Sequence, residues 1–182
     1  MRKDLIFLIG FMTAGKSTIG KILANTIGWN FIDLDQEIEQ IEKKSVIKIF
    51  KENGEDYFRN LESITLKNFI AEKNLVISLG GGTVENPENL ELIINNGIVI
   101  YLEISTQEAF RRLKFKRNRP VLYNDSDEEV SDEELIERIN NIFARRINIY
   151  NKAHIKLNTD KTKVGKTVDS LVKILRRDYG IK

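Results

Sequence analysis

The chain has 182 residues, of which 41% are hydrophobic and 31% are charged, and its formal net charge is +2. This composition is typical of a globular protein, and so small a net charge does not indicate a nucleic-acid or membrane partner. With no cysteine and one histidine, disulfides, cysteine-bound metals and histidine clusters are excluded. No apolar run approaches the ~18 residues that cross a bilayer, so we expect a cytoplasmic protein, a monomer with one domain at residues 1–182.

Short apolar runs predict five β-strands, with longer amphipathic stretches between them. The strands are expected at Leu5–Ile9, Asn30–Asp33, Leu75–Ser78, Ile98–Leu102 and His154–Leu157. The first run follows two basic residues, but Asp4 interrupts them and no small-residue cleavage site follows, so a strand is favoured over a signal peptide. Strands that are apolar throughout and alternate with helices predict an α/β fold, with a five-stranded parallel sheet and helices on both faces.

Three predicted helices begin with capping patterns, which are Asn86 before Pro87, Ser105 with Glu108, and Ser131 with Glu134. Two other segments do not fit plain crossover helices. Residues 34–61 hold two short helical patterns, and we interpret them as a substrate-binding insertion. A longer helix is expected from about residue 56 to residue 73. Residues 113–130 pass from basic to acidic residues, and we interpret them as a lid, because long loops in compact domains are usually functional or disordered.

The stretch GFMTAGKST matches the phosphate-binding pattern G-x-x-x-x-G-K-[ST] through Gly10, Gly15, Lys16 and Ser17. It directly follows an apolar strand and precedes a helical pattern, which favours a nucleoside-triphosphate site over a plain glycine-bounded turn. In such a loop the backbone N–H groups surround the phosphates, the lysine contacts the β- and γ-oxygens, and the serine holds Mg²⁺. Thr13 stands where many kinases of this type have another glycine, so its side chain has the potential to crowd the loop.

Two carboxylates, Asp33 and Asp35, lie at the end of the second predicted strand. In an extended chain they point the same way, and ligands of open α/β sheets bind at the carboxyl ends of the strands. One carboxylate would act on Mg²⁺ through water, while the other would orient a substrate hydroxyl for in-line attack. The alternative is that Asp35 only caps the next helix.

Arginines from two distant segments are candidates for binding a substrate anion. Arg59 precedes Glu62 by three residues on a predicted helix, so the two either form a solvated surface pair or aim the guanidinium at a carboxylate. Arg146 is either a second anion site or, together with Arg145, a favourable charge near a helix C-terminus.

Three consecutive glycines, Gly80, Gly81 and Gly82, follow the third predicted strand. On their own they are consistent with a flexible turn. Beside the acidic and basic candidates, they are interpreted as a bare backbone floor on which a carboxylated ring rests, with N–H groups available to its hydroxyls.

Basic residues are concentrated at 111–119, which superficially resembles a nucleic-acid patch. The acidic run at 125–134 argues against nucleic acid, because it would repel a phosphate backbone. A lid that carries a few catalytic cations over ATP explains both runs.

Together, these motifs resemble the shikimate kinase family over essentially the whole chain. The resemblance rests on GFMTAGKST, DLDQEIE, FRNLE, SLGGGTV, NRPVL and RRINIY, in the family's order and approximate spacing. It implies a P-loop kinase fold and ATP-dependent phosphorylation of the 3-hydroxyl of shikimate, giving shikimate 3-phosphate and ADP. This reaction is a step of aromatic amino-acid biosynthesis, in the chorismate pathway.

The resemblance also implies roles for individual residues. ATP contacts are expected from Gly10, Thr13, Ala14, Gly15, Lys16, Ser17, Thr18, Arg112 and Arg119. Mg²⁺ contacts are expected from Ser17 and Asp33, and shikimate contacts from Asp35, Arg59, Gly80, Gly81, Gly82 and Arg146. The catalytic set is expected to be Lys16, Asp35 and the lid residue Arg119.

Two other classes of function remain open from the residues alone. One is another small-molecule P-loop kinase, of the gluconate or nucleoside monophosphate type. The other is a non-catalytic ATP-binding module, for which Thr13 and the basic segment are the only indications.

Overall fold

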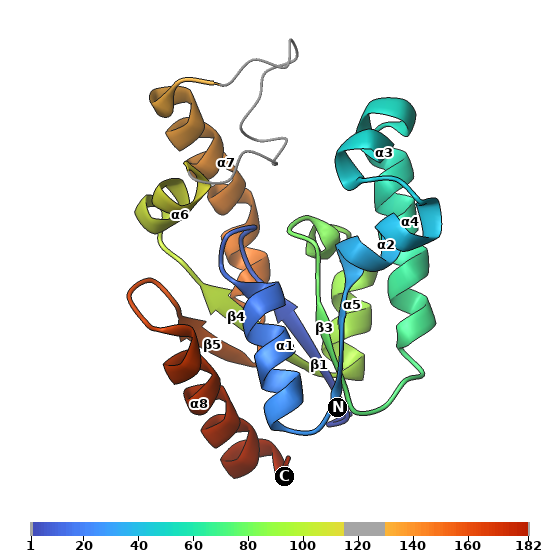
Figure 1. Ribbon diagram of the computed structural model, residues 1–182, viewed down its shortest axis with the longest axis vertical. Coiled ribbons are helices and arrows are strands. Elements are labelled where there is room, and N and C mark those ends of the chain that lie inside the picture. The colour runs from blue at the N-terminus through green and yellow to red at the C-terminus, as the bar shows by residue number, and fades with distance from the viewer. Residues whose placement is uncertain (1, 115–129, 182) are drawn as a thin grey trace.

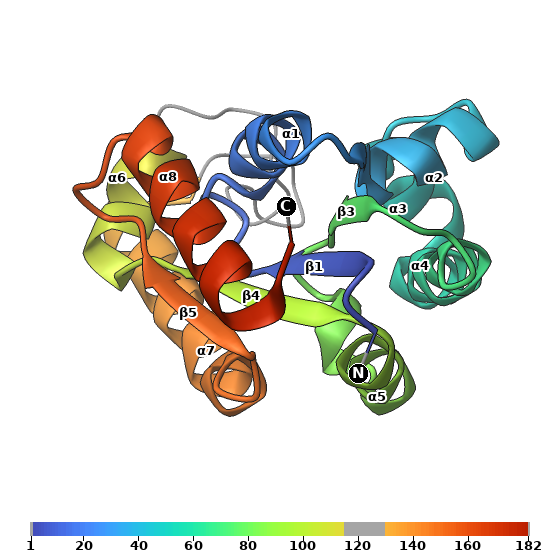
Figure 2. The ribbon, with the colours of Figure 1, turned by 90° about the horizontal axis from the view of Figure 1, so that it is seen from below.

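A parallel β-sheet with helices on both faces forms the centre of the protein (Figures 1 and 2). The structure is a computed structural model that describes residues 2–114 and 130–181. Within these residues the sheet has five strands in the order β2-β3-β1-β4-β5. The strands are β1 (Leu5–Ile9), β2 (Asn30–Asp33), β3 (Leu75–Ser78), β4 (Ile98–Glu103) and β5 (Ile155–Asn158). All five predicted strands are confirmed, with no end displaced by more than one residue.

The helices follow the strands in the alternation that the sequence predicts. They are α1 (Lys16–Thr26), α2 (Leu34–Glu42), α3 (Val46–Asn53), α4 (Glu55–Phe69), α5 (Pro87–Asn96), α6 (Thr106–Leu113), α7 (Asp132–Tyr150) and α8 (Val164–Ile174). A single 3₁₀ turn, η1 (Thr83–Glu85), precedes α5, and a π-helical segment, η3 (Leu175–Tyr179), follows α8.

The predicted caps are all present in the structure. The Asn86 side chain accepts hydrogen bonds from two backbone N–H groups at the start of α5, with Pro87 as the first helical residue. Ser105 and Ser131 each accept from the N–H three residues further on, at 3.2 Å in both cases. Because these caps satisfy donors that no helical carbonyl can reach, they define where α5, α6 and α7 begin.

Alternating residues of the central strands build two apolar layers, one on each face of the sheet. Ile6 and Leu8 face α1 and α8, which contact each other (Figure 2). Leu5 and Phe7 belong to the opposite layer, together with Ile93 of α5. This alternation is the period-2 pattern of strands buried on both faces.

Helices α2, α3 and α4 pack against one another beside the β2–β3 edge of the sheet (Figure 1). The sequence predicts the last of them from about residue 56 to residue 73, but α4 ends at Phe69. At that end the backbone bonds reach back three residues instead of four, from the Ile70 N–H to the Lys67 carbonyl and from the Glu72 N–H to the Phe69 carbonyl. Arg2 donates hydrogen bonds to the carbonyls of Ile70 and Glu72, and Asn74 adopts a left-handed φ of 52°. These contacts turn the chain into β3.

The strand register brings the loops that follow β1, β2 and β3 together at the carboxyl ends of the strands. Ser78 of β3 is the partner of Leu8 in β1 and of Asp33 in β2. The loops that follow these three strands therefore begin side by side, at the edge where ligands of open α/β sheets bind.

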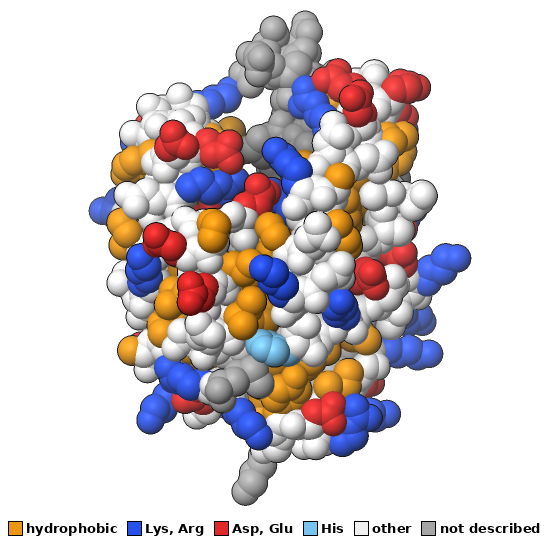
Figure 3. Space-filling model, turned by 180° about the vertical axis from the view of Figure 1, so that it is seen from behind, with side chains coloured by type: hydrophobic (Ala, Val, Ile, Leu, Met, Phe, Trp, Pro, Cys, Tyr) orange, Lys and Arg blue, Asp and Glu red, His pale blue; other side chains and the backbone are white. Residues whose placement is uncertain are grey.

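Charged side chains of both signs are interspersed on the face shown in Figure 3. Among residues 2–114 and 130–181, no helix is both long and apolar enough to span a bilayer.

His154 joins the start of β5 to β4. Its Nδ1 accepts a hydrogen bond from the Val99 N–H at 2.9 Å, and its own backbone N–H donates to the Val99 carbonyl at 2.9 Å. Accepting at Nδ1 requires the neutral ring, and burial lowers the pKa of His154 below its ordinary value of 6.5.

We therefore expect the free energy of unfolding to fall as the pH drops below about 6.5. The unfolded chain takes up the proton first, so the contribution of His154 is complete above the unfolded pKa and is lost as the pH falls through the lower folded pKa. Urea unfolding between pH 5 and pH 7.5 measures this. His154→Asn places a non-titrating acceptor oxygen beside Val99 and should have a flatter profile; identical profiles would remove His154 as the cause.

Candidate active site

The loop between β1 and α1 needs glycine at both of its ends. Gly10 has a φ of 142°, and a Cβ there would lie 2.6 Å from the carbonyl oxygen of Leu102. Gly15 has a φ of 89° and is the N-cap of α1. Side chains are strained at both positions, which explains the G-x-x-x-x-G spacing. The loop ends at a helix N-terminus, where backbone N–H groups and the helix dipole favour anions.

Lys16 is the first residue of α1, and its side chain crosses back over the loop. It is buried, and its Nζ donates to the carbonyls of Gly10 at 2.9 Å and Phe11 at 3.1 Å. The ammonium group therefore lies above the space that the loop surrounds, where it would meet phosphate oxygens.

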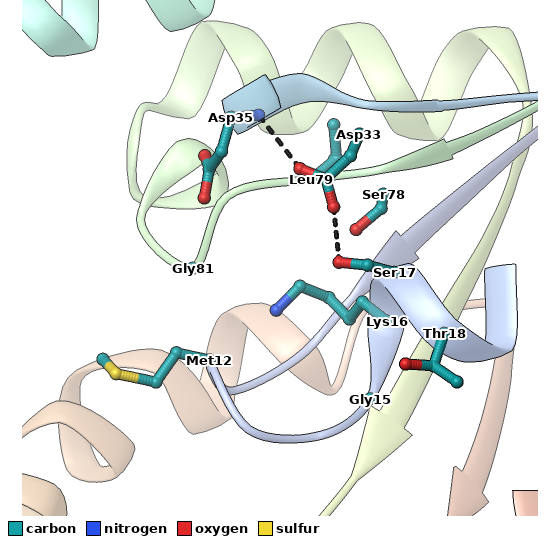
Figure 4. A pocket seen from close by; sticks show the side chains of 10 residues that line it. All are labelled: Met12, Gly15, Lys16, Ser17, Thr18, Asp33, Asp35, Ser78, Leu79 and Gly81. Atoms are coloured by element: carbon teal, nitrogen blue, oxygen red, sulfur yellow. Dashed lines mark hydrogen bonds between the residues drawn. The ribbon is translucent and has the colours of Figure 1, made fainter. Parts of the chain in front are cut away.

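Ser17 and Asp33 bring a hydroxyl and a carboxylate together across the same space (Figure 4). The Ser17 hydroxyl donates to Oδ2 of Asp33, while Oδ1 of Asp33 accepts from the backbone N–H of Asp35 at 3.2 Å. Asp33 is therefore the N-cap of α2, and the alternative that Asp35 caps this helix is wrong. The residue that ends the strand takes the capping position because Leu34 is already helical.

Asp35 lies in the first turn of α2, so the assumption that both aspartates belong to an extended chain is also wrong. The two carboxylates nevertheless line one pocket of about 130 Å³, in which Asp33 points toward Ser17 and Asp35 points toward Gly81 (Figure 4). The residues that line the pocket are Met12, Gly15, Lys16, Ser17, Thr18, Asp33, Asp35, Ser78, Leu79 and Gly81.

Arg59 on α4 is held by two carboxylates. Its Nη1 donates to Glu62 at 2.6 Å, and its Nε and Nη2 donate to Glu55 at 3.1 and 2.8 Å. Burial disfavours the charged guanidinium, but Glu62 and Glu55 outweigh burial and raise the pKa of Arg59. The predicted pair with Glu62 is confirmed, and since the Glu62 side chain is only 1% exposed, it is not a solvated surface pair.

The three glycines each lie against a different functional side chain. A Cβ on Gly80 would meet Oε1 of Glu62 and would lie 2.7 Å from Oδ1 of Asp35, and a Cβ on Gly82 would be 2.5 Å from Nη2 of Arg59. A Cβ on Gly81 would be 3.1 Å from Nη1 of Arg146. None of the three has a positive φ. At Gly80 and Gly82 the close approach of side chains, rather than an unusual backbone conformation, accounts for glycine, while the contact at Gly81 is looser.

Arg146 is buried on α7 and its Nε donates to the Glu85 carboxylate. The alternative that it serves the helix C-terminus is wrong, because the last turn of α7 contains no basic residue; the neighbouring Arg145 is exposed.

Burial raises the pKa of the Tyr150 phenol, and the nearby Arg146 opposes that rise. Even so, neither Nη1 of Arg146 nor the Tyr150 hydroxyl has a hydrogen-bond partner among the described residues. Nη1 is thus a buried donor beside Gly81 that is available to an anion.

Arg112 connects the phosphate loop to the loop after β5. It donates to the carbonyls of Thr13 at 3.1 Å, Thr159 at 2.8 Å and Asp160 at 3.2 Å, and its Nε pairs with Glu108. Thr13 is accommodated as a buried side chain, although its hydroxyl has no partner within the described part of the chain. The ATP contact expected for Arg112 stays a prediction.

The predicted lid residue Arg119 and most of the predicted lid at 113–130 lie outside the described residues. Their roles stay predictions.

Sequence reasoning missed three residues that contact the site arginines or their partners: Glu55, Thr83 and Glu85. Glu55 carries a detectable signal, since it precedes Arg59 by four residues on one helix. Thr83 and Glu85 contact residues 21 and 61 positions away, a separation that no local pattern reveals.

Comparison with known proteins places this geometry in a family. The family model "Shikimate kinase" matches residues 12–176. A shikimate kinase of Chloroherpeton thalassium is 42% identical over 176 residues, covering 97% of this chain and 94% of the relative. One from Chlorobium limicola is 46% identical over 174 residues, covering 96% and 87%.

Solved structures agree with the sequence matches. The shikimate kinase of Bacteroides thetaiotaomicron superposes with a TM-score of 0.87 at 34% identity, covering 95% of this chain and 98% of that one. A gluconokinase from Sinorhizobium meliloti shares the fold alone, with a TM-score of 0.59 at 13% identity and coverage of 97% and 94%. The predicted P-loop kinase fold is confirmed. The chain belongs to the shikimate kinase family.

Proposed function

We propose that this site transfers the γ-phosphoryl group of ATP to the 3-hydroxyl of shikimate, giving shikimate 3-phosphate and ADP. One observation carries the proposal: Asp35, Arg146 and Arg59 lie against Gly80, Gly81 and Gly82 in turn, next to the phosphate loop. A related kinase, from Acinetobacter baumannii, has been solved in complex with shikimate and superposes with a TM-score of 0.87 at 28% identity, covering 97% of this chain and 94% of that one.

The arrangement suits an acceptor that has a carboxylate at one end and a hydroxyl at the other. Arg59 and Arg146 would bind the carboxylate, because guanidinium groups form short, directional hydrogen bonds with it. Asp35 would accept a hydrogen bond from the reacting hydroxyl and take its proton as the phosphoryl group arrives. Lys16 would neutralise the charge on the phosphates. Phosphoryl transfer asks for little beyond this positioning and charge stabilisation.

The donor set also fits Mg²⁺. Ser17 and Asp33 offer a hydroxyl and a carboxylate at the pocket, and hard cations prefer such oxygen ligands. Within the described ranges, no group of three or more acidic, histidine or cysteine side chains is placed to hold a metal ion. Mg²⁺ commonly keeps several water ligands and binds nucleotide phosphates, so it needs only one or two ligands from the protein. When bound, Mg²⁺ would neutralise charge on the β- and γ-phosphates.

Residues 34–61 would be a substrate-binding insertion within one domain, which is supported by the positions of Asp35 and Arg59 on α2 and α4. Residues 113–130 would be the lid, with Arg119 reaching ATP. We also propose a cytoplasmic monomer with no nucleic-acid or membrane partner, supported by the small net charge and by the mixed charges on the face shown in Figure 3.

A direct test is ADP release measured with ATP and Mg²⁺ in the presence of shikimate, gluconate or nucleoside monophosphates. We expect release that depends on shikimate and not on the other acceptors. Preference for gluconate or a nucleotide would assign the site to another small-molecule kinase. ATP binding without acceptor-dependent release would indicate a non-catalytic module.

Gly82→Ala should raise the KM for shikimate on the order of 10-fold, about the loss of one charged hydrogen bond. The new Cβ would lie 2.5 to 2.6 Å from the Arg59 guanidinium and displace it. The Gly82 φ of −102° allows alanine, and the displaced group is the end of a flexible side chain, so the melting temperature should change little. Steady-state kinetics and thermal melting measure the two effects.

Gly165→Ala is the matched control, because no atom lies within 4 Å of the Cβ it would add. It should leave the KM unchanged. If Gly82→Ala lowered the melting temperature while the KM stayed normal, the glycine would be structural only.

A further inference from the structure

The 3₁₀ turn η1 lies directly after the glycine triplet and is anchored at both ends. The Thr83 N–H donates to the Gly80 carbonyl at 3.4 Å, and the Glu85 N–H donates to the Gly82 carbonyl at 2.9 Å. The side chain of Asn89, on α5, donates to the Thr83 carbonyl at 3.1 Å. The side chains of η1 therefore start from a backbone that is held in place.

At the first residue of η1, Thr83 reaches toward Arg59 through Glu62. The buried Thr83 hydroxyl donates to Oε1 of Glu62 at 2.5 Å, while Oε2 of Glu62 accepts from Nη1 of Arg59 at 2.6 Å. Both oxygens of a carboxylate with almost no solvent exposure are thus in use. Rotation of Glu62 would break at least one of these bonds, so Thr83 constrains the direction of Arg59.

At the last residue of η1, Glu85 contacts Arg146 directly. Its carboxylate accepts from Nε, on the edge of the guanidinium away from Nη1. Nη1 is left buried beside Gly81, with no partner among the described residues. The contact therefore fixes the side chain while it leaves one donor for a ligand.

We propose that Thr83 and Glu85 are positioning residues that set the direction and separation of Arg59 and Arg146. The proposal rests on the proposed function, in which both arginines bind the carboxylate of shikimate. Two donors that bind one carboxylate must be held close to the productive geometry, and an arginine side chain loses rotamer entropy when it is fixed. Because η1 orders both arginines before the substrate arrives, less of that entropy is lost on binding.

The test compares Thr83→Val and Glu85→Ala with conservative partners. Valine keeps the shape of threonine but removes the hydroxyl donor, and alanine removes the carboxylate. We expect each to raise the KM for shikimate on the order of 10-fold, with kcat and the KM for ATP within about twofold of wild type. Thr83→Ser and Glu85→Gln keep a hydroxyl donor and an acceptor oxygen respectively, and should recover most of the loss.

Glu88→Ala is the matched control, since Glu88 lies three residues beyond Glu85 and its side chain is 82% exposed. It should leave the KM for shikimate unchanged. If Thr83→Val fails to fold because Glu62 loses its donor, Glu85→Ala still tests the proposal, because the Glu85 side chain is 36% exposed.

A double-mutant cycle shows through which arginine each residue acts. In an Arg146→Lys background, Glu85→Ala should raise the KM no further, whereas Thr83→Val should still do so. An equal loss of shikimate and ATP affinity, or a lower melting temperature with a normal KM, would overturn the positioning role. If the wild-type protein releases no ADP with shikimate, the proposed function itself is wrong. If wild-type turnover is normal and Thr83→Val and Glu85→Ala leave the KM for shikimate unchanged, only the positioning role is wrong.

Discussion

Asp35→Asn is expected to lower kcat by about 10²- to 10⁴-fold, the usual contribution of a general base. Asparagine keeps the shape of the side chain and can still accept a hydrogen bond, but it cannot take up the proton of the attacking hydroxyl. Asp35 lines the pocket beside Lys16 and Ser17, so the loss should fall on the chemical step. Binding of ATP with Mg²⁺ should be nearly unchanged. Steady-state kinetics with shikimate and calorimetric titration with a non-hydrolysable ATP analogue measure the two quantities.

Glu37→Gln is the matched control for this experiment. Glu37 is the other acidic residue in the first turn of α2, but it does not line the pocket. Both substitutions remove a negative charge from the same helix N-terminus, so both lose a similar favourable interaction with the helix dipole. Only Asp35→Asn should reduce kcat. A near-normal rate for it would remove Asp35 from the mechanism, and an equal loss in both variants would attribute the effect to the helix.

The parts of the fold that sequence predicted well depend on local constraints. The strands are short apolar runs between polar segments, and Asn86, Ser105 and Ser131 cap helices within three residues of themselves. The phosphate loop is equally local, because Gly10 and Gly15 are required by their own backbone conformation. The pair of Arg59 with Glu62 follows from helical spacing alone. Each of these features needs only a few consecutive residues.

The parts that sequence did not predict depend on contacts between distant elements. The partner of Arg146 is Glu85, and the two residues come together only when α7 packs against η1. The hydrogen bond from Thr83 to Glu62 likewise forms only when η1 packs against α4. That Asp33 rather than Asp35 caps α2 has a different cause, since it depends on a helix that begins at Leu34 without any break after the strand.

The glycine triplet shows how the two kinds of information combine. The sequence favours an interpretation of the three glycines as a floor for a ring. The structure adds that a side chain on Gly80 or Gly82 would collide with Asp35 or Arg59. Space is thus needed for the protein's own functional groups, whether or not a ligand is present. The floor stays a prediction, and the close approach of these side chains explains why Gly80 and Gly82 carry no side chain.

Arg146→Lys is expected to raise the KM for shikimate by roughly 10- to 100-fold, because a hydrogen bond to a charged group contributes about 1.5–3 kcal/mol. Lysine keeps the positive charge but has one nitrogen, which cannot both pair with Glu85 and face the substrate beside Gly81. The KM for ATP should stay near wild type, since Arg146 does not line the phosphate pocket.

The neighbouring Arg145→Lys is the matched control, because Arg145 lies on the same turn of α7 and is exposed. It should behave as wild type. Charge alone predicts no difference between the two lysine variants, whereas directional binding of a carboxylate predicts a defect only at position 146. Equal KM values for shikimate in both variants would therefore show that Arg146 contributes only its charge. Titration of each variant with shikimate in the absence of ATP separates substrate affinity from turnover.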